Sequence, residues 1–212
     1  MKDISRVRLA VLVCDGVSAL PFETLVREIV AGGADLVQLR EKSLADGVLL
    51  ERAKLCRDIC RDCLFIVNDR ADIAVLSKAD GVHVGPEDLP VAAARQILGR
   101  GLIGASAYGI KEIIAAEKAG ADYLGVGAVF PTGTKDVAGL VAGLPLVSEA
   151  SRIATRPWFA IGGITLENVS SVVAAGARAV AVSSAILRSS DPRGATDSVK
   201  SAISRALQQT AP

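Results

Sequence analysis

The sequence predicts an α/β fold, a single-domain (β/α)₈ TIM barrel that covers residues 1–212. Three observations support this prediction: eight short apolar runs, amphipathic stretches between them, and a length of 212 residues. Barrels of this class typically need roughly 200–250 residues. Neither a linker nor a low-complexity stretch interrupts the sequence, so the repeated units are assigned to one domain.

The eight apolar runs are rich in Val, Ile, Leu and Ala and are the expected strands. They are residues 8–14, 35–40, 64–69, 81–85, 102–107, 123–128, 158–163 and 179–184. Alternation of strand and helix requires parallel strands with right-handed crossovers. Near-continuous apolar strands fit a sheet that is covered on both faces. A doubly wound open sheet is the alternative, but residues 14–21 lack the GxGxxG turn that usually follows its first strand.

Amphipathic stretches with a helical period predict the helices. They lie within residues 21–34, 45–60, 112–121 and 166–177. Three of them end in Gly-Ala, and a glycine just past a helix supplies the left-handed turn that leads into the next strand. These glycines are Gly33, Gly120 and Gly176. The expected helix starts are marked by Pro90, Thr165 and Asp191-Pro192.

Composition excludes several classes of partner. The chain has 24 basic and 23 acidic residues, and only 3% of its residues are aromatic. Neither a basic arm nor a stacking platform for nucleic acid is therefore expected. Apolar runs stay below the ~20 residues of a membrane span, and the N-terminal run is too short for a signal peptide. We therefore expect a cytoplasmic protein that binds neither nucleic acid nor membranes.

The four cysteines allow two interpretations. They are Cys14, Cys56, Cys60 and Cys63. The last three could form a metal or redox cluster, but neither a histidine nor a further cysteine lies close enough in sequence to complete a tetrahedral zinc site. Small buried thiols are the preferred interpretation.

Polar side chains follow the expected strands at the edge where barrel active sites collect. The second run continues into QLREK, in which Gln38, Arg40 and Lys42 share one direction because side chains alternate along a strand. The next four strands deliver further polar residues to the same edge. These are Asn68 and Asp69 after the third, Asp88 after the fourth, Ser106 on the fifth, and Thr132, Thr134 and Lys135 after the sixth.

Two aspartates predict a magnesium site. Asp69 and Asp88 come from neighbouring strands, so both could ligate one ion. Carboxylates without a nearby thiolate or histidine cluster suit Mg²⁺, which is the expected cofactor. Arg40, Lys42 and Lys135 could hold phosphate oxygens that the metal does not reach. A single charge at a strand end is often only surface charge, but here four strands contribute.

A second anion site is expected after the last two strands. Gly162-Gly163 and Ser183-Ser184 follow these strands, and each pair leads into a helix. These loops are the recurrent phosphate site of the fold, because their free backbone N–H groups point at the anion. Gly163 would permit close approach and Ser184 could donate a hydroxyl, although Gly-Gly could also only form a tight turn. Two anion sites suit an enzyme that joins two phosphorylated molecules.

Several other residues have competing interpretations. His83, the only histidine, is expected to be a hydrogen-bonded residue of the barrel interior rather than a proton shuttle, and Trp158 a packing residue. Lys42 or Lys135 could be a Schiff-base lysine of an aldolase, but the paired aspartates and the T-x-T-K segment favour polyphosphate binding. The loop 131–143 is a candidate lid.

The order of these motifs resembles the thiamine-phosphate synthase family over nearly the whole chain. The matching segments are QLREK (38–42), NDR (68–70), ADGVHVGxxDLP (79–90), IGAS (103–106), ADYxGVGxVFPTxTK (121–135), AIGGI (160–164) and SAI (184–186). The resemblance implies a transferase that joins 4-amino-2-methyl-5-hydroxymethylpyrimidine diphosphate to 4-methyl-5-(2-phosphoethyl)thiazole. The products would be thiamine phosphate and pyrophosphate.

The resemblance also implies roles for individual residues. The pyrimidine diphosphate would be bound by Gln38, Arg40, Lys42, Asn68, Ser106 and Lys135. Mg²⁺ would be ligated by Asp69 and Asp88. The thiazole phosphate would be held by Thr132, Thr134, Gly163, Ser183 and Ser184. The catalytic candidates are Arg40, Lys42, Ser106 and Lys135, because they would stabilise the leaving diphosphate without a general base.

The sequence departs from the family pattern at three positions and leaves other readings open. Pro86, Tyr108 and Ala128 stand where family members commonly have Gln, His and Pro, which bears on ring recognition and rate. The closest rival is a TenI-type thiazole tautomerase, which shares the barrel and the thiazole phosphate site but has no use for diphosphate or magnesium. A non-catalytic paralogue that binds thiamine phosphates is another. The oligomeric state, with a homodimer as one option, and the thiazole tautomer used are not determined by the sequence.

Overall fold

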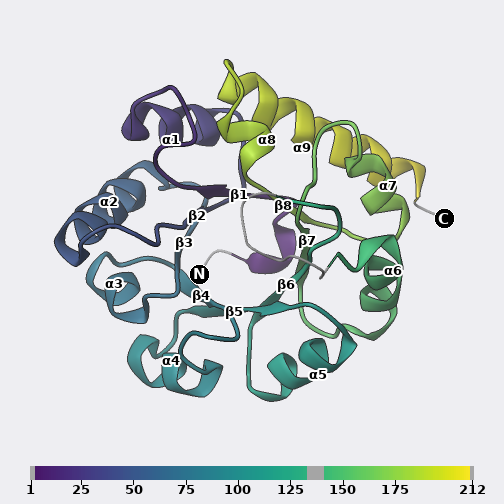
Figure 1. Cartoon of the computed structure of the whole chain (residues 1–212), viewed down its shortest axis with the longest axis horizontal. Helices are drawn as coiled ribbons and strands as arrows, with labels where there is room; N and C mark the ends of the chain where they lie inside the picture. The colour runs from purple at the N-terminus through teal and green to yellow at the C-terminus, as the bar shows by residue number, and fades with distance from the viewer. Residues whose placement is uncertain (1–2, 133–140, 211–212) are drawn as a thin grey trace.

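A closed parallel barrel forms the centre of the molecule. The structure, a computed structural model, describes residues 3–132 and 141–210. Within these residues, strands β1 to β8 are hydrogen-bonded in chain order and β8 closes onto β1, with every pair parallel. Figure 1 shows the helices arranged as an outer ring around the strands. The prediction of a (β/α)₈ TIM barrel is confirmed.

Each strand lies inside one of the eight predicted runs. The strands are β1 (Leu9–Val13), β2 (Leu36–Leu39), β3 (Leu64–Asn68), β4 (Gly81–Val84), β5 (Leu102–Ala107), β6 (Tyr123–Gly127), β7 (Trp158–Ile161) and β8 (Val180–Val182). Nearly every strand residue is buried, because the helices cover one face of the sheet and the barrel interior encloses the other.

The helices follow the predicted pattern with one exception. They are the 3₁₀ helix η1 (Ile4–Arg6) and the α-helices α1 (Phe22–Ala31), α2 (Asp46–Ile59), α3 (Ala71–Leu76), α4 (Val91–Leu98), α5 (Ile110–Lys118), α6 (Gly143–Ile153), α7 (Val169–Ala174), α8 (Ser184–Leu187) and α9 (Pro192–Gln209). The start predicted at Thr165 is wrong, because α7 begins after Asn168, whose side-chain oxygen accepts the Thr165 amide at 2.8 Å. The start predicted at Asp191 is confirmed, because the Asp191 carboxylate accepts a hydrogen bond from the Gly194 amide at 2.9 Å and α9 begins at the next residue. None of the helices in the described ranges is long and apolar enough to cross a membrane.

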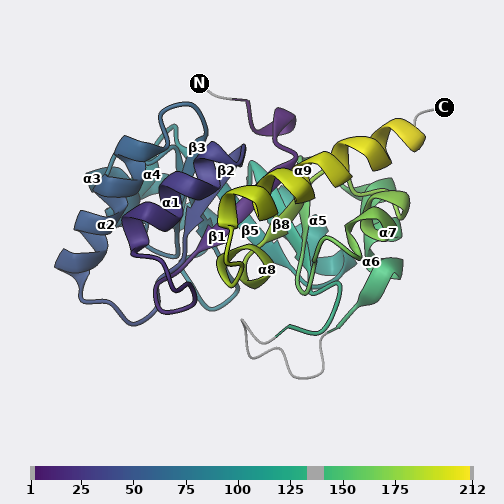
Figure 2. The same cartoon turned by 90° about the horizontal axis from the view of Figure 1, so that it is seen from above.

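The apolar core has an inner and an outer layer. The inner cluster fills the amino-terminal half of the barrel with side chains such as Leu36, Leu64 and Leu102, and Ile4 of η1 packs against it. Figures 1 and 2 show η1 lying over the centre of the ring at one end of the barrel. The outer cluster lies between strands and helices. With one end of the interior filled by apolar side chains, polar side chains can gather at the other.

The cysteines belong to the outer layer. Cys56, Cys60 and Cys63 are buried, Cys14 is half-buried, and none of the four is in a disulfide. Burial raises the pKa of the Cys56 thiol to about 12, so this thiol stays protonated at neutral pH. The interpretation of small buried thiols is confirmed for these three residues.

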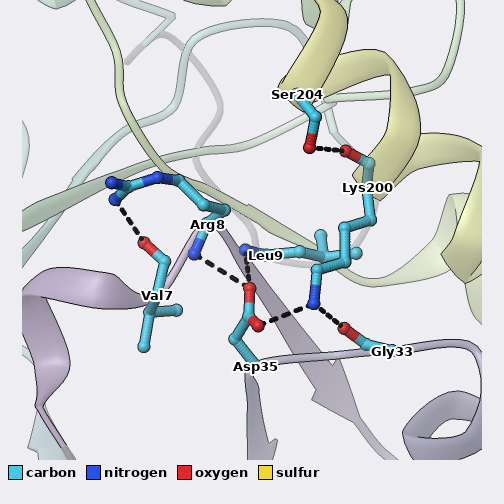
Figure 3. Close-up of polar contacts among 7 residues, drawn as sticks. All are labelled: Val7, Arg8, Leu9, Gly33, Asp35, Lys200 and Ser204. Atoms are coloured by element: carbon cyan, nitrogen blue, oxygen red, sulfur yellow. Dashed lines mark hydrogen bonds and ion pairs between the residues drawn. The ribbon is translucent and has the colours of Figure 1, made fainter. Parts of the chain in front are cut away.

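Asp35 ties three elements together at the amino-terminal end of the barrel (Figure 3). One carboxylate oxygen accepts the backbone amides of Arg8 and Leu9 at 3.0 and 3.1 Å. The other accepts Lys200 Nζ of α9 at 2.7 Å, and Lys200 also donates to the Gly33 carbonyl. The aspartate before β2 thereby holds the start of β1 and the last helix in register.

The same arrangement recurs two and four strands further on. Asp80, before β4, accepts the Phe65 amide of β3 at 2.8 Å and pairs with Arg57 of α2 at 2.6 Å. The third copy is Asp122, before β6, which accepts the Ile103 amide of β5 at 2.8 Å and pairs with Arg95 of α4 at 2.6 Å. These three aspartates, here called the strand clamps, join β1, β3 and β5 to the strand that follows each of them and to the helices α9, α2 and α4, respectively. The corresponding residue before β8 is Arg178, which is exposed.

Replacing one strand clamp is expected to reduce stability without affecting the opposite end of the barrel. Asp122→Ala removes the acceptor of a strand amide and the partner of Arg95. Hydrogen bonds to charged groups contribute roughly 1.5–3 kcal/mol, so we expect a loss of about 2 kcal/mol in the free energy of unfolding, measured by urea denaturation. Asp197→Ala, at an exposed position of α9, is the control. Equal unfolding midpoints for the two variants would contradict the clamp role.

Candidate active site

A cavity lies at the carboxyl-terminal ends of the strands, and all eight strands or the loops after them contribute to its lining. Every predicted site residue that the structure describes faces this cavity. They are Gln38, Arg40, Lys42, Asn68, Asp69, Asp88, Ser106, Thr132, Gly163, Ser183 and Ser184. Thr134 and Lys135 lie outside the described residues, as does most of the candidate lid 131–143.

A pair of carboxyl groups forms one side of the cavity. Asp69 directly follows β3 in a left-handed backbone conformation, with φ of 63°, and its amide donates to the His83 carbonyl at 2.8 Å. Asp88 follows β4, and its carboxylate accepts the Gly85 amide at 2.7 Å. The two carboxyl groups lie close enough for Asp88 to affect the pKa of Asp69. Two loops from adjacent strands therefore hold two acids together.

This proximity has an electrostatic consequence. Burial and the neighbouring Asp88 raise the pKa of Asp69 to about 6, while Lys42, with Nζ 3.6 Å from the Asp69 carboxylate, acts in the opposite direction. Two adjacent acids that face a cavity repel each other when both are ionised. A cation between them would relieve this repulsion. Within residues 3–132 and 141–210, no group of three or more Asp, Glu, His or Cys side chains is placed to hold a metal ion.

Side chains along residues 38–42, at the end of β2, point alternately into the cavity and to the outside of the barrel. Gln38 is buried, and Arg40 and Lys42 line the cavity. Glu41 lies between them and points to the outside of the barrel. Its carboxylate accepts hydrogen bonds from the Arg52 guanidinium at 2.9 Å and from the Asp15 backbone amide at 2.7 Å. The alternation predicted for QLREK is thus realised.

The side chains of the NDR motif, residues 68–70, also point in different directions. Asn68 and Asp69 line the cavity. Arg70 instead pairs with Asp46 at 2.5 Å and with Asp72 at 2.7 Å. Its guanidinium is therefore engaged by carboxylates of α2 and α3 and serves to hold these helices together.

The loops after β7 and β8 form the opposite side of the cavity. Gly162 and Gly163 both have positive φ, 103° and 62°. A Cβ at Gly163 would lie 2.5 Å from the Pro131 carbonyl oxygen, so only glycine fits beneath the loop that follows β6. Asn168 donates to the Gly163 carbonyl at 2.9 Å and holds the turn in place.

After β8, the chain turns directly into the short helix α8. Ser183 donates its hydroxyl to the Leu12 carbonyl at 3.0 Å, and Ser184 is the first residue of the helix. The start of α8 therefore adjoins the Gly162-Gly163 turn at the cavity, away from the acidic pair. Two separate polar regions line one cavity, as expected from the sequence.

His83 lies at the floor of the cavity. Its Nδ1 is 3.2 Å from the Tyr123 hydroxyl and its Nε2 is 3.1 Å from the Ser106 hydroxyl. The prediction of a hydrogen-bonded interior residue is confirmed, and His83 also faces the cavity. Trp158 is half-buried against the outer core, as predicted for a packing residue.

Some cavity residues were not singled out from the sequence. Thr165 lines the cavity but was assigned only as a helix start. Tyr123 was not recognised as a polar partner, because an apolar strand pattern does not show what a phenol will contact inside a closed barrel. Of the three departures from the family pattern, Tyr108 and Ala128 line the cavity, whereas Pro86 is exposed.

Comparison with known proteins agrees with this geometry. The family model described as thiamine monophosphate synthase matches residues 10–186. The chain belongs to the thiamine monophosphate synthase family. The resemblance seen in the motifs is confirmed, and many of the residues that line the cavity lie in those motifs.

Individual relatives support the assignment to the thiamine monophosphate synthase family. The chain is 50% identical over 175 residues to a thiamine-phosphate synthase of Synechococcus sp. (strain CC9311), which covers 81% of this chain but only 49% of that protein. It therefore spans about half the length of this relative. It is 44% identical over 201 residues to the thiamine-phosphate synthase of Methanocella arvoryzae, covering 93% of this chain and 95% of that one.

Solved structures show the same fold. The thiamine phosphate pyrophosphorylase from Pyrococcus furiosus superimposes with a TM-score of 0.90 at 37% sequence identity, covering 96% of this chain and 98% of that one. A 3-hexulose-6-phosphate synthase superimposes with a TM-score of 0.66 at 20% identity, covering 92% of this chain and 99% of that one. At this identity the second likeness concerns the barrel alone.

Proposed function

We propose that the protein is a thiamine-phosphate synthase. It would join 4-amino-2-methyl-5-hydroxymethylpyrimidine diphosphate to 4-methyl-5-(2-phosphoethyl)thiazole and release pyrophosphate. The observation that carries the proposal is a single cavity with an acidic and cationic region on one side and a glycine and serine turn on the other. One region suits a metal-bound diphosphate and the other a phosphate monoester.

The proposed chemistry needs charge stabilisation more than proton transfer. The bond between the pyrimidine methylene carbon and the diphosphate oxygen breaks, and the electron pair leaves with the diphosphate. The thiazole nitrogen then forms a bond to the methylene carbon. Arg40, Lys42, Ser106 and Lys135 would stabilise the leaving diphosphate by donating hydrogen bonds and providing positive charge. Gln38 and Asn68 would help to bind the pyrimidine substrate.

Asp69 and Asp88 would hold Mg²⁺. Their common position at the cavity and the raised pKa of Asp69 support this assignment, because repulsion between two adjacent carboxylates is relieved by a shared cation. Mg²⁺ is commonly bound through one or two carboxylates, with water and phosphate oxygens as the remaining ligands. When bound, it would neutralise charge on the diphosphate.

Thr132, Thr134, Gly163, Ser183 and Ser184 would hold the thiazole phosphate. Support comes from the position of Gly163 beside the loop after β6, because this contact brings Thr132 to the same cavity as the two serines. Backbone amides at such turns are good donors to phosphate oxygens.

Gly163→Ala is expected to weaken binding of the thiazole phosphate selectively. The added methyl group would meet the Pro131 carbonyl oxygen at 2.5 Å and displace the loop that carries Thr132. We expect the KM for the thiazole phosphate to rise about tenfold, equivalent to roughly 1.4 kcal/mol, with little change in the KM for the pyrimidine diphosphate. Gly99→Ala, which has a similar φ of 64° but open space around its Cβ position, controls for backbone strain. Equal effects on both KM values would contradict the assignment.

The function is tested by incubating the protein with both phosphorylated rings and Mg²⁺ and measuring thiamine phosphate and pyrophosphate. Folded protein without product would overturn the proposal. Conversion of the thiazole phosphate to its tautomer without a pyrimidine substrate would indicate the tautomerase instead. Borohydride trapping of substrate on Lys42 or Lys135 would indicate an aldolase, and tight binding of thiamine phosphate without turnover a non-catalytic paralogue.

We propose that this activity resides in one domain, residues 1–212. We also propose that the protein acts in the cytoplasm, where phosphorylated metabolites occur. Its partners are the two small phosphorylated substrates. Gel filtration at working concentrations would distinguish a monomer from the homodimer considered above.

A further inference from the structure

A buried carboxylate lies between two cations of the cavity in the sequence. The side chain of Glu41 is only 7% exposed and does not line the cavity, whereas Arg40 and Lys42 on either side of it do. One oxygen of this carboxylate, Oε1, accepts both the Arg52 guanidinium at 2.9 Å and the Asp15 backbone amide at 2.7 Å. The proposed chemistry gives this carboxylate no contact with a substrate, so its role has to lie in what it holds.

The partners of Glu41 come from two other segments of the chain. Arg52 lies on α2, and its Nη2 donates to the Asp15 carboxylate at 2.6 Å while its Nη1 donates to Glu41. The Arg52 guanidinium also lies over the ring of Phe22, the first residue of α1, at 4.7 Å from the ring centroid. Helices α1 and α2 are neighbours in the outer ring (Figure 1). The loop after β1, the segment after β2 and these two helices therefore meet at Arg52.

The backbone that carries the two cations has few other attachments. The Arg40 amide donates to the Val13 carbonyl at 2.9 Å. Among the residues that the structure describes, the backbone amides of residues 41–44 donate to no other backbone carbonyl. At the far end of this segment, the apolar side chain of Leu44 packs against the outer core. Between these two points, the hydrogen bonds of the Glu41 carboxylate are the polar contacts that fix the course of the chain.

We propose that Glu41 is a positioning residue that directs Arg40 and Lys42 toward a diphosphate group in the cavity. Because side chains alternate along an extended segment, holding Glu41 outside the barrel holds its two neighbours inside. Arg52 has a second role in this arrangement. By neutralising Glu41, it prevents this carboxylate from pairing with the two cations in competition with the anion. The inference rests on the proposed function, which places the diphosphate at these cations.

Two substitutions of Glu41 separate positioning from charge. The measurement is calorimetric titration with inorganic pyrophosphate in the presence of Mg²⁺. Glu41→Ala removes Oε1, and we expect the Kd for pyrophosphate to rise about tenfold because the two cations are misplaced. Glu41→Gln removes the same charge but keeps one oxygen that can accept both donors, so it should bind pyrophosphate at least as tightly as the wild type. An effect of charge alone would tighten binding in both variants, because each loses a negative charge near the anion.

Glu23→Ala is the matched control. The Oε1 atom of Glu23 also accepts two hydrogen bonds from an arginine, those of Arg27 Nε at 3.0 Å and Arg27 Nη2 at 2.7 Å. This pair lies on α1 and does not line the cavity. The variant therefore loses the same kind of interaction and is expected to bind pyrophosphate as the wild type does. Urea denaturation of every variant ensures that the binding measurements are made on folded protein.

A substitution of Arg52 tests the second role from the other side of the ion pair. Arg52→Met keeps an unbranched side chain against Phe22 but leaves the Glu41 carboxylate without its cation. We expect the Kd for pyrophosphate to rise about tenfold, because this carboxylate can now compete for the two cavity cations. Adding Glu41→Gln to Arg52→Met removes the competing charge and should restore the affinity to within about threefold of wild type. A loss that the second change does not restore would overturn this role of Arg52.

The outcomes separate this inference from the proposed function. In Glu41→Ala, we expect the KM for the pyrimidine diphosphate to rise about tenfold with the KM for the thiazole phosphate unchanged, whereas a smaller fraction of folded protein would change neither KM. Wild-type affinity for pyrophosphate in Glu41→Ala, tighter binding in both Glu41 variants, or no binding by the wild-type protein would overturn the inference. The expected affinities in a protein that makes no thiamine phosphate would support it and refute only the synthase activity.

Discussion

Asp69→Asn is expected to lower kcat/KM for thiamine phosphate formation about 100-fold, equivalent to about 2.7 kcal/mol. The change removes one negative charge from the acidic pair and the partner of Lys42, while asparagine keeps the size of the side chain. Asparagine also tolerates the left-handed backbone at this position, where φ is 63°. The variant therefore tests charge rather than backbone conformation.

The thermal midpoint of Asp69→Asn should be equal to or above that of the wild type, because repulsion between Asp69 and Asp88 is relieved. Raising the Mg²⁺ concentration should restore part of the activity if the loss arises from weaker metal binding. The matched control is Asp72→Asn, an exposed carboxylate three residues away that pairs with Arg70 at 2.7 Å. A wild-type rate in Asp69→Asn would refute its assignment as a metal ligand.

Lys135→Ala is expected to lower kcat by about 100-fold or more, because it removes a positive charge from the leaving diphosphate. The position lies outside the described residues, so the prediction rests on the sequence. Lys135 follows β6 by eight positions and Thr132, which lines the cavity, by three. The loss should appear in kcat more than in the KM for the thiazole phosphate, because the charge acts as the diphosphate departs.

Lys111→Ala, on α5, is a control that removes the same charge from outside the cavity lining. Lys135→Arg adds a second comparison, because arginine keeps the charge but not the shape of the ammonium group. We expect it to recover part of the activity lost in Lys135→Ala. Equal rates for Lys135→Ala and wild type would remove Lys135 from the set of catalytic residues.

The acidic pair and the strand clamps show why parts of the site could be predicted and others could not. Asp69 and Asp88 follow successive strands, and parallel strands of a barrel deliver their ends to one edge, so their meeting follows from order along the chain. Asp35, Asp80 and Asp122 also precede strands at regular intervals, in the repeated pair Ala-Asp. The basic partners of these aspartates are Lys200 on α9, Arg57 on α2 and Arg95 on α4. These partners could not be predicted from any local pattern in the sequence.

The sequence by itself determined the barrel, its strand positions and the residues at the strand ends. These features depend on periodicity and chain order, which are local properties that a closed parallel sheet converts into positions on one rim. Only the tertiary structure decided that Arg70 faces outward, that Asn168 precedes α7, and that Tyr123 meets His83 beneath the cavity. Such contacts depend on side-chain packing between strands far apart in sequence, where small differences in space and hydrogen-bonding geometry select the partner.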